Sequence, residues 1–197
     1  MTSHYTTKLT RDNAGIVLVD FLDGFLPGIK TIEHRLLRKN VEGFVKLSAL
    51  FSMPTIQLGE EGGFRGKFFS ELTDNNEHAV PIERHTPSAW DEPAFVEEVK
   101  KHDRKKWIVG GISLDICTTL LTLDMLHHGY EVYVVTDVCG SDTELNQMAA
   151  MMRLSQAGAT MTSWACLASE LMVDWQTPEG PKVGELYDQL TMWGNRV

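Results

Sequence analysis

The chain has 197 residues, of which 43% are hydrophobic and 23% are charged, as in globular proteins rather than disordered ones. This length favours a single domain with a substantial core. The formal net charge of −9 argues against a large nucleic-acid interface, because binding to phosphates requires a basic face.

The N-terminus and the cysteines indicate where the protein resides. The first ten residues, MTSHYTTKLT, contain no apolar segment, so we expect no signal peptide. No apolar run approaches the roughly 18 residues of a membrane span. The three cysteines (Cys117, Cys139 and Cys166) cannot all pair within one chain and form no CxxC motif. We therefore expect reduced thiols, a cytoplasmic location, and neither a membrane nor a nucleic-acid partner.

Short apolar runs alternate with amphipathic stretches along the chain. The continuous apolar run from Gly15 to Asp20 predicts a strand buried on both faces. Apolar residues at helical spacing between Leu37 and Phe51 predict a helix. A second strand is expected at Pro54–Leu58, followed by a glycine-rich loop over Gly59–Gly66.

The alternation continues to the C-terminus. The further elements expected are a strand near Val80–Glu83, a helix from Asp91 to His102, a strand at Lys106–Gly110, a helix from about Leu114 to His128, a strand at Glu131–Thr136, a helix from Asp142 to Gln156, a strand at Thr160–Trp164 and late helical segments. Crossovers between such strands are right-handed and give a parallel sheet covered on both faces. The predicted fold class is three-layer α/β/α with a mainly parallel central sheet of about five or six strands.

Three chemically distinct residues follow the ends of separate predicted strands. Asp20 closes the first strand, Arg84 follows the third, and Cys117 lies just after the fourth. Because ligands bind beyond the carboxyl ends of strands in open parallel sheets, we expect these residues to share one edge of the sheet.

Cys117 is placed in the first turn of a helix whose candidate N-cap is Ser113. Unpaired N–H groups and the positive end of the helix dipole stabilise a thiolate there. A nearby guanidinium would add to this effect, whereas Asp115 opposes it. The alternative is a buried cysteine that packs as a small hydrophobic residue, which is the structural role that we assign to Cys139 and Cys166.

The other candidate residues also have ordinary explanations. An aspartate such as Asp20 often begins a turn or caps a helix, although Asp23 is the more natural turn residue here. Arg84 alone would be a surface or ion-pair residue, and His85 beside it would be a solvated loop residue or a substrate contact.

Common cofactor and nucleophile motifs are missing. The Gly59–Gly66 loop has Glu61 where a phosphate-binding loop needs its first glycine, and Phe68 where it needs Ser or Thr. There is no GxGxxG, HExxH or GxSxG motif. We therefore expect no cofactor.

Several segments together resemble the isochorismatase-like cysteine hydrolases, most closely their YcaC-related branch. The matching segments are Ile16–Asp20, Arg84–Trp90, Val109–Cys117, Tyr133–Asp137, Ser155–Ala159, Glu170-Leu171 and Asp174-Trp175. The resemblance covers about Ala14 to Trp175, which implies a single domain with a C-terminal helical extension over 176–197.

The resemblance implies a catalytic triad. In it Asp20 accepts the thiol proton, Cys117 is the nucleophile, and Arg84 stands where most members have lysine. Arginine keeps the positive charge but cannot act as a neutral amine. On this basis, Arg84→Lys would preserve or raise activity. The resemblance also implies a cis peptide bond at Ile112-Ser113, which turns backbone N–H groups, including that of Cys117, toward an oxyanion.

Departures from related enzymes narrow the implied reaction. Nicotinamidases of this superfamily hold a metal through histidines after the second strand, but Gln57–Phe64 contains none, so we expect no catalytic metal. Retention of Cys117 favours acyl transfer. The implied function is hydrolysis of a small amide-type C–N bond through a thioester. The alternatives are isochorismatase-type ether hydrolysis, which should not need Cys117, and a non-catalytic oligomeric binding protein that retains the pocket.

We also expect a homo-oligomer acting on a small molecule, partly from the resemblance. The C-terminal third is rich in methionine and aromatic residues, which are enriched at interface cores, although core packing would explain many of them equally well. These residues are Met151, Met152, Met161, Trp164, Met172, Trp175, Met192 and Trp193.

Overall fold

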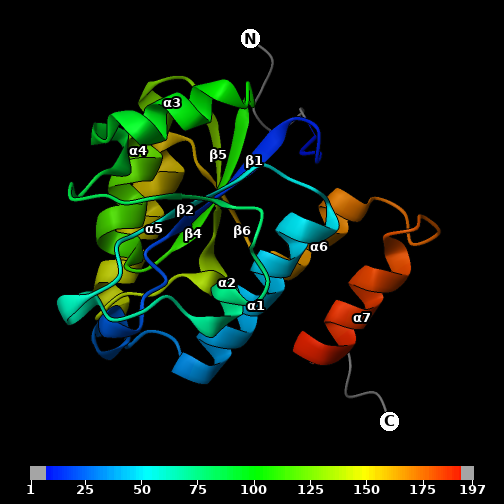
Figure 1. Ribbon diagram of the computed structural model, residues 1–197, viewed down its shortest axis with the longest axis horizontal. Coiled ribbons are helices and arrows are strands. Elements are labelled where there is room, and N and C mark those ends of the chain that lie inside the picture. Colours follow the sequence, from blue (N-terminus) through cyan, green and yellow to red (C-terminus); the bar gives the residue numbers. More distant parts are fainter. Residues whose placement is uncertain (1–7, 192–197) are drawn as a thin grey trace.

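The computed structural model describes residues 8–191 and has a six-stranded sheet at its centre (Figure 1). The strand order is β3-β2-β1-β4-β5-β6, and every neighbouring pair is parallel. The strands are β1 (Ala14–Val19), β2 (Thr55–Leu58), β3 (Val80–Ile82), β4 (Lys106–Gly111), β5 (Glu131–Val135) and β6 (Thr160–Thr162). The predicted fold class is confirmed.

Helices cover both faces of the sheet. The longer helices are α1 (His34–Leu50), α3 (Pro93–Lys101), α4 (Thr119–His127), α5 (Glu144–Ala157), α6 (Trp164–Met172) and α7 (Gly180–Leu190), and α2 (Ser70–Thr73) is a single turn. In Figure 1, α3, α4 and α5 lie on one side of the sheet, while α1, α6 and α7 lie on the other. Within residues 8–191, no helix is both long enough and apolar enough to cross a membrane.

The two central strands, β1 and β4, form the middle of the core. Every residue in both strands is buried, as their continuous apolar sequences predict. Lys106, at the start of β4, is the one charged residue in these two strands and is only 1% exposed. Its ammonium group pairs with the Glu131 carboxylate and lies near the hydroxyl group of Tyr133. Burial of this charge is therefore compensated within the sheet.

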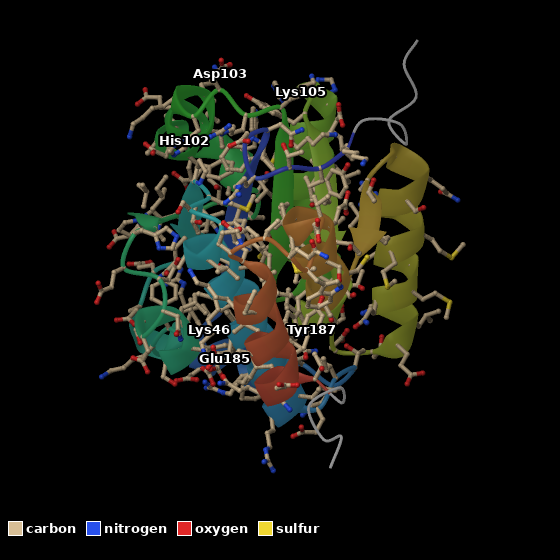
Figure 2. The ribbon with its side chains drawn as sticks, turned by 90° about the vertical axis from the view of Figure 1, so that its right-hand side faces the viewer. Lys46, His102, Asp103, Lys105, Glu185 and Tyr187 are labelled. Carbon is tan, nitrogen blue, oxygen red and sulfur yellow. The ribbon has the colours of Figure 1, made fainter. Side chains whose placement is uncertain are left out.

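The C-terminal helix α7 packs beside α6. Figure 2 views the molecule with Lys46, Glu185 and Tyr187 near α7 and with His102, Asp103 and Lys105 at the far end of the sheet. The Tyr187 hydroxyl donates a hydrogen bond to the carbonyl of Ala165, which joins α7 to α6. Part of the predicted extension over 176–197 is therefore helical, whereas Met192, Trp193 and the residues after them lie outside the described chain.

Two local predictions need correction. The helix expected from Leu114 begins with a π-helical turn over Leu114–Thr118, and regular α-helix starts only at Thr119. Cys166 lies exposed on α6, so the packing role predicted for it is wrong. Cys139, in contrast, is buried.

Close backbone approach at the end of β4 requires glycine. A Cβ atom on Gly111 would lie 2.4 Å from Val19 Cβ and 2.5 Å from the Val19 carbonyl oxygen. A backbone atom of a central strand cannot move aside. Gly111 therefore lets the carboxyl ends of β1 and β4 meet.

We expect Gly111→Ala to lower the free energy of unfolding by about 1–3 kcal/mol, because the added methyl group overpacks the centre of the sheet. Gly184→Ala is the matched control, since a Cβ there meets no atom within 4 Å and the residue lies inside α7. This control should stabilise by roughly 0.5–1 kcal/mol. Urea denaturation of the two variants measures both values, and equal effects would contradict the packing argument.

Candidate active site

Asp20 stands directly after β1 and turns its carboxylate into the interior. Its backbone φ of 52° lies in the left-handed region, which aspartate tolerates better than most residues. The backbone N–H of Asp20 donates to the Leu58 carbonyl at 3.1 Å, which ties this turn to the end of β2. The residue is 3% exposed, so its carboxylate needs a partner.

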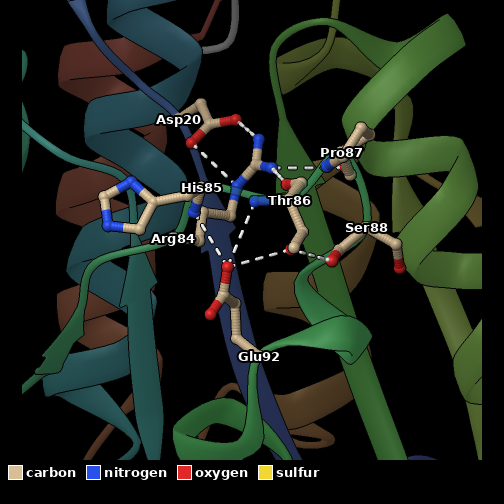
Figure 3. A network of polar contacts seen from close by, with 7 residues as sticks. All are labelled: Asp20, Arg84, His85, Thr86, Pro87, Ser88 and Glu92. Carbon is tan, nitrogen blue, oxygen red and sulfur yellow. Dashed lines mark hydrogen bonds and ion pairs between the residues drawn. The ribbon is translucent and has the colours of Figure 1, made fainter.

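Arg84 supplies that partner from the segment after β3. Its Nε donates to Asp20 Oδ1 at 3.2 Å, and its Nη2 donates to Asp20 Oδ2, which makes a two-pronged ion pair (Figure 3). On the other side, Nη1 donates to the carbonyls of Thr86 and Pro87. The side chains of Asp20 and Arg84 are 4% and 9% exposed. The guanidinium group is thus held from both sides.

Cys117 comes to the same place from the π-helical turn after β4. Its thiol lies close enough to Asp20 and Arg84 for both charges to shift its pKa. It also lines a cavity of about 400 Å³. The structure therefore brings together the three residues singled out from the strand ends.

The cavity beside Cys117 is apolar and acidic. Its apolar wall includes Phe25, Ile29 and Ile116. Its polar residues include Asp115 and Asp142, and no lysine, arginine or histidine lines it. The Oδ1 atom of Asp115 is buried and has no hydrogen-bond partner within residues 8–191. Such a lining is unfavourable for an anionic ligand.

Burial dominates the protonation of the thiol. It raises the pKa of Cys117, which the positive charge of Arg84 lowers in part and the Asp20 carboxylate raises further. The stabilised thiolate expected from the helix position is therefore not what the structure favours. The raised pKa favours the protonated thiol at rest.

The ion pair itself is also shifted by burial. Burial raises the pKa of Asp20, and the hydrogen bonds and charge of Arg84 oppose this increase. For Arg84, burial acts to lower the pKa, but the hydrogen bonds and charge of Asp20 outweigh it and the pKa is raised. Arg84 therefore stays charged, while Asp20 is the group that can exchange a proton with Cys117.

The turn that carries Cys117 leaves backbone donors available. The peptide bond Ile112-Ser113 is cis, the bond at which the resemblance implies a cis peptide. The Ser113 carbonyl accepts from the N–H of Thr118 at 3.3 Å, whereas in an α-helix it would accept from Cys117. The Ser113 hydroxyl makes no capping hydrogen bond, although the residue stands at the N-cap. The N–H of Cys117 is released from that bond.

Neighbouring residues take the ordinary roles considered for them. The His85 side chain is 68% exposed, and its Nδ1 lies 3.5 Å from a Glu60 oxygen, away from the Asp20–Arg84 pair (Figure 3). Asp23 pairs with Arg38 on the surface side of the loop. Within the described part of the chain, no group of three or more His, Cys, Asp or Glu side chains is placed to hold a metal ion.

Some residues of the site were missed by sequence reasoning. Asp142 and Asn146, at the start of α5, line the cavity and share a hydrogen bond of 2.7 Å. The rule of strand carboxyl ends could have found them, because they follow β5. The segment after β1 contributes Phe25 and Gly28 to the cavity lining, whereas residues 59–69 contribute nothing to it.

Comparisons with known proteins agree with this architecture. The family model of the isochorismatase domain matches residues 16–166. The probable hydrolase YcaC of Escherichia coli is 34% identical over 178 residues, which are 89% of this chain and 85% of YcaC.

Two solved structures are similar over nearly the whole chain. YcaC from Pseudomonas aeruginosa, with hexane-2,5-diol and covalent acrylamide, has a TM-score of 0.89 and 30% identity, covering 94% of this chain and 92% of that one. The E. coli YcaC structure, described as an octameric hydrolase of unknown specificity, has a TM-score of 0.88 and 32% identity, covering 93% and 91%.

The electrostatics predict how the thiols respond to pH. We expect Arg84→Ala to move the pH profile of Cys117 alkylation upward by about 1 unit or more, because a cation that lowers the thiol pKa is removed. Iodoacetamide labelling followed by mass spectrometry of the peptides measures the profile. Cys166 serves as an internal reference. Cys139, whose pKa burial raises to about 12, should stay unlabelled at neutral pH while the protein is folded. An unchanged Cys117 profile would contradict the role of Arg84.

Proposed function

The chain belongs to the isochorismatase family, in its YcaC-related branch, and is a hydrolase; we propose that it cleaves a small amide-type C–N bond through a thioester on Cys117. The observation that carries this proposal is the convergence of Cys117 with the Asp20–Arg84 pair at the carboxyl edge of the sheet, where Cys117 also lines a cavity. A thiol nucleophile with an adjacent carboxylate that can accept its proton is suited to acyl transfer.

In the first step, Cys117 Sγ attacks the carbonyl carbon of the amide. The S–H bond breaks as the C–S bond forms, and Asp20 takes the proton. This coupling is needed because burial raises the pKa of Cys117. The electrons of the carbonyl double bond move to its oxygen, which accepts hydrogen bonds from backbone N–H groups of the turn after Ser113, including that of Cys117. One such donor is typically worth ~2.7–4 kcal/mol in the transition state.

The intermediate then collapses toward products. The C–N bond breaks, Asp20 gives its proton to the leaving nitrogen, and a thioester remains on Cys117. Asp20 next accepts a proton from water, whose oxygen attacks the thioester carbon. The C–S bond breaks, and Asp20 returns the proton to sulfur as the acid leaves. Arg84 stays charged and keeps the Asp20 carboxylate oriented toward the thiol.

The alternative reactions have less support. Isochorismate is a dicarboxylate, and a cavity with Asp115 and Asp142 but no cationic side chain in its lining disfavours such a substrate. The YcaC structure from P. aeruginosa contains covalent acrylamide, which supports a reactive nucleophile in that protein. The binding-protein alternative rests on arginine in the usual lysine position.

We expect Cys117→Ser to abolish acid release from small amides, and Asp20→Asn to lower it roughly 10²–10⁴-fold by removing the proton acceptor. Single-turnover assays over a panel of neutral amides measure both effects. Cys166→Ser is the matched control, because this thiol is exposed on α6, and it should keep full activity. Amide hydrolysis that survives Cys117→Ser would contradict the thioester, and ether hydrolysis that survives it would favour the alternative reaction.

We further propose that the protein forms a homo-oligomer through the outer face of α5. On that face, Leu145, Met148 and Met152 are 75%, 59% and 56% exposed. Beside them lies a groove of about 790 Å³ lined partly by Met151 and Met161. Exposed apolar clusters of this kind mark interaction surfaces. The octameric state described for E. coli YcaC supports a second copy of the chain as the occupant.

Met152→Lys should shift the protein to a smaller assembly, because a charge would be buried in the interface. Gln189→Lys is the control, since it adds the same charge at an exposed position of α7. Sedimentation at micromolar concentration measures the mass of each form. A monomeric wild-type protein would rule the oligomer out, and an unchanged assembly of Met152→Lys would place the interface elsewhere.

A further inference from the structure

The backbone turn that follows β3 binds the Arg84 guanidinium through its carbonyl groups. The carbonyl oxygens of Thr86 and Pro87 converge on Nη1, opposite the Asp20 carboxylate that binds Nε and Nη2 (Figure 3). These four hydrogen bonds use all three nitrogens of the side chain. The position of Arg84 therefore depends on the conformation of residues 84–88.

One carboxylate oxygen holds that turn. Glu92 Oε1 accepts from the N–H of His85 at 2.8 Å and the N–H of Thr86 at 3.1 Å. The Thr86 hydroxyl lies 3.0 Å from the same oxygen and 2.6 Å from the Ser88 carbonyl. Figure 3 shows these contacts beneath the Asp20–Arg84 pair. Hydrogen bonds to a charged acceptor are stronger than those between neutral groups. Glu92 is thus the centre from which the turn is organised.

The far end of the turn is tied to the helix that carries the nucleophile. The Ser88 hydroxyl donates to Asp124 Oδ2 at 2.5 Å. Asp124 belongs to α4, which continues directly from the π-helical turn of Cys117. The turn therefore bridges α3, where Glu92 is the N-cap residue, and the segment that places the thiol.

We propose that Glu92 is a positioning residue, which fixes the Thr86 and Pro87 carbonyls so that they hold Arg84 against Asp20 and Cys117. Its catalytic consequence rests on the proposed function. Glu92 acts through the backbone of its neighbours and through Arg84.

The same geometry explains why arginine suits this position. A lysine has one nitrogen with three N–H groups, so it cannot bond two carbonyls on one side and both oxygens of a carboxylate on the other. A lysine would therefore give up hydrogen bonds to the Thr86 and Pro87 carbonyls or to the Asp20 carboxylate, which is 4% exposed. We therefore expect Arg84→Lys to lower activity, contrary to the expectation from the resemblance.

The test is the pH dependence of Cys117 alkylation in Glu92→Gln and Glu92→Ala. Loss of positioning weakens the influence of Arg84, so the profile should move upward, by roughly 1 unit for Glu92→Ala and less for Glu92→Gln. Mere removal of a negative charge would move it downward, so the sign separates the two effects. The kcat on a hydrolysed amide should fall roughly 10–100-fold, with a smaller change in KM.

Two controls keep the outcome interpretable. Glu97→Gln removes the same charge from the exposed face of α3 and should leave the Cys117 profile unchanged. Thr86→Val removes the hydroxyl that lies between Glu92 Oε1 and the Ser88 carbonyl, with little change in shape. It loosens the same turn, so it should shift the profile in the same direction as Glu92→Gln if Glu92→Ala fails to fold. The Cys166 profile, measured on the same chains, should not move.

An unshifted or lowered Cys117 profile in Glu92→Gln and Thr86→Val would overturn the positioning role. Alkylation reports on the thiol whether or not an amide is hydrolysed. An upward shift without hydrolysis by the wild-type protein would therefore leave the positioning inference standing and reject the proposed function. Hydrolysis by the wild-type protein, without a shift of the Cys117 profile in the variants, would reject the positioning inference and leave the proposed function standing.

Discussion

The buried pair between Asp20 and Arg84 is the interaction on which the site depends. Removing a carboxylate and a guanidinium from water is costly, and the attraction between them compensates only when every remaining donor and acceptor is satisfied. Here the carboxylate receives two guanidinium N–H groups, and the Thr86 and Pro87 carbonyls receive others. Loss of either charged partner would leave an isolated buried charge, so the pair constrains both the turn after β1 and the turn after β3.

The sheet order determines which chain segments can meet at this pair. The chain crosses from one half of the sheet to the other between β3 and β4, so the strand order reverses between the neighbouring strands β1 and β4. A crevice at the carboxyl edge is expected at such a switch point. Asp20 follows β1 and Cys117 follows β4, so they stand on its two sides. Gly111 allows the two strands to close against each other at this end. Packing at the sheet centre therefore brings together the segments that carry Asp20 and Cys117.

Much of this arrangement could be predicted from sequence, because continuous apolar strands and strand-end positions obey simple rules. The order of elements and the meeting of Asp20, Arg84 and Cys117 at one edge belong to that part. The π-helical turn could not be predicted, because its residue pattern does not differ from that of an ordinary α-helix start. The protonation of Cys117 was predicted in the wrong direction, because dipole arguments ignore the burial that only the packed structure reveals.

The role proposed for Glu92 could not be predicted from the sequence for a different reason. Glu92 binds backbone N–H groups, and because every residue except proline has one, no residue pattern reveals such a contact. In the proposed mechanism its contacts matter to the chemistry, because they hold a cation that cannot release a proton at any working pH. Only Asp20 and Cys117 exchange the proton in that mechanism. Burial raises the pKa of both groups. The pKa of the carboxyl therefore moves toward neutral pH, and the raised pKa of the thiol favours its protonated form at rest. In the proposed mechanism Asp20 is the base only when ionised, so proton transfer would fail as the pH falls through its raised pKa. Arg84 opposes that increase, and the turn held by Glu92 thereby influences how far into the acid range the site can work.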